Sequence, residues 1–176
     1  MESIGKLHVL TGDGKGKTSA AVGMAVRFSG HGGKVIFAQF LKDGTSGELA
    51  CLRRLGVVIP GMPVPSGFFS RMSPADRTKL VREYEDAVPS VMDVIRRESP
   101  GLVILDELST ALSLGVISEP VGRGLVCLSL SCAETVATGR NAPAWLLSMA
   151  DYATEFCQLR HPYASEGLPA RPGIEY

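Results

Sequence analysis

Residues 11–18 are Thr-Gly-Asp-Gly-Lys-Gly-Lys-Thr, and this stretch decides the fold. It follows a short apolar run, 7–10, and precedes a helix-forming segment that ends near Phe28. Glycine adopts positive φ angles, and loop N–H groups together with a helix N-terminus favour bound anions. In this context Lys17 would reach the outer phosphates of a nucleotide, and the Thr18 hydroxyl would ligate Mg²⁺. The stretch therefore predicts a phosphate-binding loop between a strand and a helix.

The loop departs at one position from the usual spacing G-x-x-x-x-G-K-[ST]. Thr11 stands where the first glycine is expected, so we expect Gly12 and Gly14 to make the turn. A glycine-rich helix entry that binds no ligand is the alternative interpretation. If the loop binds a nucleotide, we expect contacts from the loop and the following helix: Gly12, Asp13, Gly14, Lys15, Gly16, Lys17, Thr18, Ser19 and Arg27.

Two further segments, the apolar run 102–105 and residues 134–138, are predicted strands whose carboxyl ends present polar residues. Asp106 and Glu107 follow the first run, and Arg140 lies just beyond the second. Because the carboxyl ends of parallel strands meet at one edge of a sheet, we expect these side chains beside the phosphate loop. Arg140 is then a candidate partner of a phosphate. A solvated pair of acids and a surface arginine are the alternatives.

Asp106 and Glu107 also have the chemistry of a metal site. Mg²⁺ and Mn²⁺ prefer oxygen ligands, and in nucleotide sites they bind carboxylates together with phosphates. With the Thr18 hydroxyl, these two carboxylates predict a site for Mg²⁺ or Mn²⁺ next to the phosphate loop.

The order of elements predicts an α/β fold of the P-loop NTPase-like (RecA/Rossmann-like) class, with a mostly parallel sheet and helices on both faces. Residues 73–98 form a helical pattern in which Pro89 predicts a kink or a break. Residues 57–59 predict a short strand, and 60–73 predict a long surface loop. The length fits a single P-loop domain, 1–176.

The charge balance excludes some classes of partner. The chain has 18 Lys and Arg against 18 Asp and Glu, so it lacks the basic field of a non-specific nucleic-acid binder. It shows no apolar run long enough to span a bilayer and no secretory signal, so we expect a cytoplasmic protein without a membrane partner.

The four cysteines lack metal-site spacing and are predicted to be buried, reduced thiols: Cys51, Cys127, Cys132 and Cys157.

Over nearly its whole length the sequence resembles the P-loop type of ATP:corrinoid adenosyltransferase. The resemblance rests on a series of motifs in order along the chain, not on a single one. They are Thr11 to Ala21, Arg27, Gly30 to Gly32, Gln39 to Lys42, Gly47-Glu48, Gly67-Phe68, Leu105 to Leu108, Thr138 to Pro143, Ala150-Asp151, Thr154-Glu155, His161 to Tyr163 and Gly173 to Tyr176.

This resemblance implies transfer of the 5′-deoxyadenosyl group of ATP to the Co(I) of a reduced corrinoid, with release of tripolyphosphate, in cobalamin biosynthesis or salvage. The cobalt is the nucleophile, so the protein would position ATP and stabilise the leaving triphosphate through Lys17, Arg140 and Mg²⁺. The resemblance also implies that Phe68 and Phe69 assist reduction of a Co(II) corrinoid. Ser70 stands where the family usually has tryptophan, which weakens that last expectation.

The resemblance further implies a homodimer and a flavoprotein reductase as electron donor. The weakly charged segment 118–133 is a candidate dimer surface. Two other functions stay open: an ordinary P-loop ATPase or small-molecule kinase, and a paralogue that binds ATP or a corrinoid without turnover. Either complete cobalamin or an early corrinoid intermediate fits as the acceptor.

Overall fold

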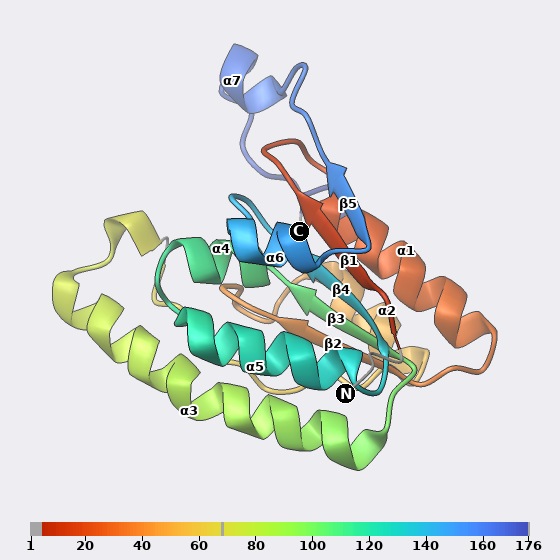
Figure 1. Ribbon diagram of the computed structural model, residues 1–176. Helices are drawn as coiled ribbons and strands as arrows, with labels where there is room; N and C mark the ends of the chain where they lie inside the picture. Colours follow the sequence, from red (N-terminus) through yellow and green to blue (C-terminus); the bar gives the residue numbers. More distant parts are fainter. Residues whose placement is uncertain (1–4, 68, 176) are drawn as a thin grey trace.

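Five parallel strands form one sheet in the computed structural model, which describes residues 5–67 and 69–175. Their order across the sheet is β2-β3-β4-β1-β5 (Figure 1). Every pairing is parallel, so the predicted class of sheet is confirmed. The strands are β1 (Leu7–Thr11), β2 (Val35–Gln39), β3 (Leu102–Asp106), β4 (Glu134–Thr138) and β5 (Tyr152–Glu155).

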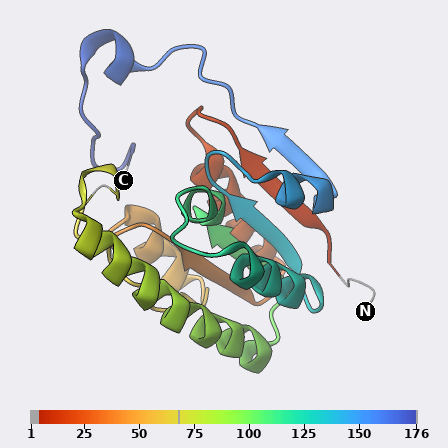
Figure 2. The ribbon, with the colours of Figure 1, turned by 60° about the vertical axis from the view of Figure 1, so that its left-hand side comes forward.

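Helices cover both faces of the sheet, as predicted (Figures 1 and 2). One face carries α1 (Lys17–Gly30) and α2 (Gly47–Arg54). The other face carries α3 (Pro74–Glu98), α4 (Leu108–Ser113), α5 (Glu119–Leu130) and α6 (Ala144–Met149). The short elements η1 (Phe69–Arg71) and α7 (Pro162–Glu166) lie outside these layers. No described helix has the length and apolar character needed to cross a bilayer.

The position of β1 in the sheet fixes where a ligand can bind. The chain leaves β1 toward α1 on one face, whereas it leaves the neighbouring strand β4 toward α6 on the other. In open α/β sheets, ligands bind at the carboxyl ends of the strands where connections diverge in this way. The predicted phosphate loop follows β1 at this point.

The helix α3 continues through Pro89, so the predicted break is wrong. Proline lacks an N–H and leaves the carbonyl of Glu85 without its helical partner. Both residues are exposed, so water can bond that carbonyl, while Tyr84, Val88 and Val91 stay buried and hold the helix on the sheet. The predicted N-cap is confirmed, since Ser73 Oγ accepts a hydrogen bond from the Asp76 N–H at 3.1 Å.

Two other predictions also need correction. Residues 57–59 form a single bridge, Ile36 to Val58, instead of a strand. The cysteines are unpaired, as predicted, but Cys51, Cys127 and Cys157 are exposed and Cys132 is half-buried. Cys51 and Cys127 lie on helices, where a residue beside buried neighbours in the sequence can still face outward.

The weak charge of residues 118–133 has an explanation within the chain. The helix α5 buries Leu125, Val126 and Leu130 in the core and packs beside α3. Its apolar face is therefore covered by the protein's own sheet, and its composition gives no separate indication of a dimer surface.

Tyr84 fastens the 60–73 loop to the core. Its side chain is fully buried, and its hydroxyl accepts a hydrogen bond from the Leu41 N–H at 2.7 Å and donates one to the Pro63 carbonyl at 3.0 Å. Burial raises the pKa of Tyr84, which keeps the hydroxyl protonated. One side chain of α3 therefore fixes both the loop and the backbone that follows β2.

We expect Tyr84→Phe to lower the free energy of unfolding by about 1–3 kcal/mol, because the Leu41 N–H loses its buried partner. Urea denaturation followed by circular dichroism measures this change. The matched control is Tyr163→Phe, at an exposed position, which should shift stability by less than about 0.5 kcal/mol. Equal stabilities for the wild type and Tyr84→Phe would show that the hydroxyl does not hold the loop.

Candidate active site

The strand-end residues predicted from the sequence meet at the carboxyl edge of the sheet. Residues 12–17 follow β1, Glu107 follows β3, and Arg140 lies just past β4. Asp106, the last residue of β3, is fully buried beneath them. The convergence that the parallel-strand argument predicts is therefore found in the structure.

The glycines of the phosphate loop allow both its turn and its close contact with another segment. Gly12 and Gly16 have φ angles of 97° and 121°, so Gly12 makes the turn in place of Thr11, as predicted. A Cβ on Gly14 would lie 2.7 Å from the Phe156 carbonyl oxygen, and the Gly14 N–H donates to that oxygen at 2.6 Å. The loop is thus shaped against the backbone that follows β5.

Lys17 lies inside the loop and is only 7% exposed. Its Nζ donates to the carbonyl oxygens of Gly12 at 2.6 Å and Gly14 at 2.8 Å. Burial lowers the pKa of Lys17, and the Glu107 carboxylate opposes this shift. The α1 N-terminus has neither a side-chain cap nor an acidic residue in its described first turn. Ammonium, N–H groups and helix dipole together fit a polyanion.

Asp106 joins four parts of the site. Its side chain is 0% exposed. One carboxylate oxygen, Oδ1, accepts hydrogen bonds from the hydroxyls of Thr18 at 2.9 Å and Thr138 at 2.7 Å. The other, Oδ2, lies 3.1 Å from Gln39 Nε2 and 3.0 Å from Lys42 Nζ. Both oxygens are thus fully partnered inside the protein.

Glu107 is held in an unusual backbone conformation, with a φ angle of 62°. Its N–H donates to Thr138 Oγ1 at 3.0 Å, and its carboxylate accepts a hydrogen bond from the Thr110 hydroxyl. These contacts aim the carboxylate so that it acts on the charge of Lys17. Glu107 therefore lies close enough to Lys17 to act on its charge, which argues against the alternative of a solvated pair of acids.

The donor set fits Mg²⁺ or Mn²⁺ bound together with a nucleotide. Thr18, Asp106 and Glu107 offer only oxygen atoms, which these ions prefer. No cluster of three metal-binding His, Cys, Asp or Glu side chains occurs among the described residues. An ion here would therefore depend on phosphate oxygens for much of its coordination, and the fully partnered Asp106 would act on it through water.

Arg140 lies at the mouth of the loop. Its Nε is 3.7 Å from the Asp13 carboxylate, and both side chains are exposed. Gly139, with a φ of 134°, brings this segment so close to α4 that a Cβ would lie 2.6 Å from the Thr110 N. The Arg140 N–H donates to Thr110 Oγ1 at 2.9 Å, so its backbone is fixed while its exposed guanidinium can exchange Asp13 for another anion.

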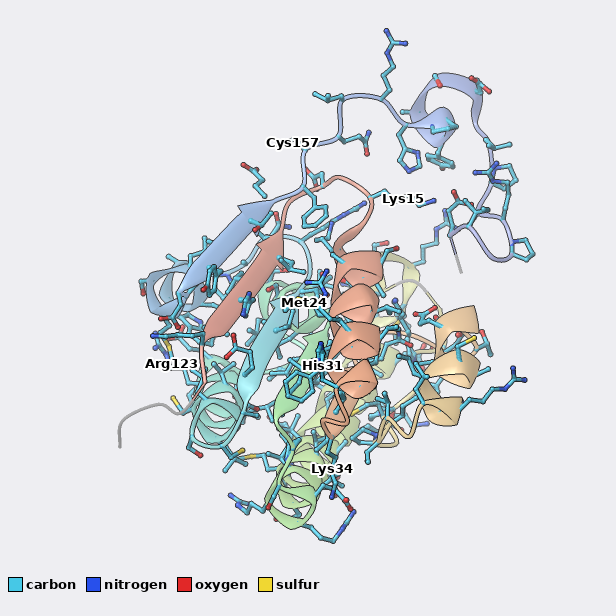
Figure 3. All side chains as sticks on the ribbon, turned by 90° about the vertical axis from the view of Figure 1, so that its right-hand side faces the viewer. Lys15, Met24, His31, Lys34, Arg123 and Cys157 are labelled. Atoms are coloured by element: carbon cyan, nitrogen blue, oxygen red, sulfur yellow. The ribbon has the colours of Figure 1, made fainter. Side chains whose placement is uncertain are left out.

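The structure separates three other predicted nucleotide contacts from the loop interior. Lys15 is paired with Glu175 at 2.9 Å, beside the C-terminal segment that extends beyond the sheet (Figure 3). Ser19 is exposed on the first turn of α1. Arg27 lies in the last turn, about 15 Å along the helix from Lys17 at the usual rise per residue, so this chain does not bring it to the phosphate loop.

Glu175 ties the C-terminal segment to the site. Its carboxylate accepts hydrogen bonds from Arg171 and from Lys15. These two partners, Arg171 first, lower the pKa of Glu175 to about 2. The Glu175 carboxylate in the ion pair with Lys15 is therefore ionised at neutral pH.

The structure describes only one of the two predicted aromatic residues, Phe69. Phe68 lies outside the described residues. Phe69 begins η1 and packs against the core, and the guanidinium of Arg77 lies 5.1 Å from the centre of its ring. Arg77 also donates to the carbonyl oxygens of Phe69 and Ser70. This anchoring orders the segment in which Ser70 replaces the usual tryptophan.

The sequence argument missed Gln39, Lys42 and Thr138 as site residues, although all three belong to motifs that carried the family resemblance. Each ends or follows a strand at the same edge as Asp106. The strand-end rule that selected Asp106 and Arg140 would have found them, had it also been applied to the end of β2 and to Thr138, the uncharged last residue of β4.

The chain is similar to known proteins over nearly its whole length. Residues 3–176 match the family model described as ATP:corrinoid adenosyltransferase BtuR/CobO/CobP. A corrinoid adenosyltransferase of Pseudomonas aeruginosa is 34% identical over 98% of this chain and 84% of its own length. One of Sinorhizobium sp is 34% identical over 98% and 80%, respectively. Corrinoid adenosyltransferase CobA of Salmonella typhimurium is 30% identical over 99% and 87%.

We expect Lys17→Ala to weaken the binding of inorganic tripolyphosphate by about 10- to 100-fold, the usual size of a lost hydrogen bond to a charged group. Isothermal titration calorimetry measures this affinity. Lys79→Ala removes an exposed lysine that pairs with Glu83 on α3 and should bind like the wild type. Undiminished binding by Lys17→Ala would exclude the loop as the triphosphate site.

Proposed function

This chain belongs to the ATP:corrinoid adenosyltransferase family, and from that premise we propose that it transfers the 5′-deoxyadenosyl group of ATP to the cobalt of a reduced corrinoid. The Co(I) electron pair forms a bond to C5′ of the ribose. The C5′–O bond breaks, and its electron pair leaves on tripolyphosphate, while the cobalt becomes formally Co(III). The full-length family match carries this proposal, because a phosphate loop alone serves many chemistries.

The residues of the site are suited to stabilising the leaving group. Negative charge grows on the triphosphate as the C–O bond breaks, and prearranged positive groups stabilise it without moving. Lys17 and the N–H groups of the α1 N-terminus occupy the loop, and Arg140 stands at its mouth. We propose that Thr18, Glu107 and, through water, Asp106 hold Mg²⁺ or Mn²⁺, which when bound neutralises phosphate charge.

The protein need not supply a nucleophile or a base, because the cobalt attacks carbon directly. Its remaining task is to hold C5′ and the cobalt in line. We propose that Phe69, with Phe68, gives the corrinoid an apolar surface that lowers the coordination of Co(II) and eases its reduction. Arg77 supports this role, because it fixes the backbone of Phe69 and Ser70.

The family also suggests the setting in which this chain acts. We propose a cytoplasmic homodimer with a single P-loop domain in each chain. A flavoprotein reductase is the proposed source of electrons for Co(II), and neither nucleic acid nor a membrane is a proposed partner. The unpaired cysteines fit a reducing compartment.

The product distribution tests the reaction. With MgATP, a Co(I) corrinoid and a strong reductant, we expect tripolyphosphate and an adenosylated corrinoid in equal amounts, followed by ion chromatography and the visible spectrum. Release of ADP at the rate of ATP loss would instead identify a kinase or ATPase. ATP binding without a cobalt–carbon bond would identify a binding protein. Parallel assays with cobalamin and early intermediates identify the acceptor.

The proposed role of Phe69 predicts a difference between two assays. Phe69→Ala should slow adenosylation from Co(II) at least about tenfold, but should change the rate from prereduced Co(I) by no more than about twofold. Met72→Ala, at a nearby half-buried position that packs on the same core, controls for loosening of the segment. Equal losses in the two assays would contradict a role in reduction.

A further inference from the structure

Lys42 is a half-buried lysine that has no part in the proposed reaction. It lies just beyond β2, and its side chain is 26% exposed. Its Nζ is 3.0 Å from Asp106 Oδ2, 3.7 Å from Glu48 Oε1 and 3.4 Å from Thr18 Oγ1. The ammonium is therefore surrounded by one hydroxyl and two carboxylates.

Two of these three groups, Thr18 and Asp106, are the ones that would hold a divalent ion. An ammonium and a metal ion that use the same oxygens repel each other, so both cannot occupy the cluster at full charge. A metal ion that binds Thr18 directly and Asp106 through water would therefore compete with the Lys42 ammonium for both groups. A lysine side chain has a flexible four-carbon stem and a compact charge, so it can move without its backbone.

The surroundings permit this exchange. The backbone before Lys42 is fixed by the bond from the Leu41 N–H to the Tyr84 hydroxyl, so only the side chain needs to move. Gln39 Nε2 donates to both Asp106 and Glu48 at 3.1 Å, so both carboxylates keep a donor when Lys42 leaves. Gln39 Oε1 is buried and lacks a hydrogen-bond partner in the described structure, and it provides an acceptor for water on an incoming ion.

We propose that Lys42 is a positioning residue that exchanges with the metal. Before substrate binds, its ammonium neutralises Asp106 and keeps the Thr18 hydroxyl in place. When the metal and triphosphate enter together, Lys42 leaves the carboxylates and pairs with a phosphate oxygen. It thereby keeps the site closed to a metal ion that arrives without triphosphate. This proposal rests on the proposed triphosphate site.

Binding of Mn²⁺ to the nucleotide-free protein, followed by electron paramagnetic resonance of the free ion, tests the proposal. Lys42→Met removes the competing charge at similar size, and we expect Mn²⁺ to bind it about tenfold more tightly than it binds the wild type. Lys42→Arg keeps the charge and should resemble the wild type. Lys34→Met is the matched control, because Lys34 precedes β2 at the opposite end of the sheet and pairs with Glu98 (Figure 3).

A second measurement uses tripolyphosphate with all divalent ions removed by EDTA. Lys42→Met should bind it about tenfold more weakly, the opposite direction to the change for Mn²⁺. A purely structural role would weaken both ligands. Mn²⁺ affinity that is unchanged or lower in Lys42→Met overturns the proposal. If Lys42→Met does not fold, Lys42→Gln replaces it with the same expected directions.

The wild type separates this proposal from the function on which it rests. If the wild type binds tripolyphosphate and forms the adenosylated corrinoid, but Lys42→Met shows no gain for Mn²⁺, only the exchange is wrong. If the wild type does not bind tripolyphosphate, the proposed function and the exchange both fail.

Discussion

The rest of the site depends on one buried charge, the carboxylate of Asp106. A carboxylate with no exposed surface is strongly destabilising unless charged or hydrogen-bonding groups surround it. Here the donors come from α1, from the end of β4, and from the end of β2 and the loop that follows it. Satisfying this one group fixes the relative positions of four segments, and the geometry of the nucleotide site follows from it.

Three cations in or beside the site are paired with carboxylates even before a ligand binds, although Lys17 is not one of them. Lys42 pairs with Asp106, Arg140 with Asp13, and Lys15 with Glu175. The zero net charge of the chain thus has a counterpart near the loop. The positive charges of Lys42, Arg140 and Lys15 are already paired with carboxylates there. Binding then exchanges partners instead of filling a bare cationic groove, and this favours a ligand that brings its own metal ion.

The sequence predicted those parts of the structure that depend on local patterns. The glycine loop, the apolar strands and the acids at the end of β3 all follow from short stretches of residues. Long-range partners could not be predicted in this way, since Lys15 and Glu175 are 160 positions apart. Arg27 lies at the far end of α1 from the phosphate loop, because ten helical positions separate it from Lys17, and its contact with a nucleotide stays a prediction. The helix does not break at Pro89, because Pro89 and Glu85 are exposed and water can bond the Glu85 carbonyl that loses its helical partner.

The contact between Gly14 and the Phe156 carbonyl joins residues 142 positions apart. This contact of the phosphate loop therefore depends on the docking of the exposed edge strand β5 on β1. Separation of β5 from β1 would accordingly remove the hydrogen bond between the Gly14 N–H and the Phe156 carbonyl. A bound nucleotide should thus protect the amide hydrogens of this edge strand from exchange, although the strand itself lies outside the loop.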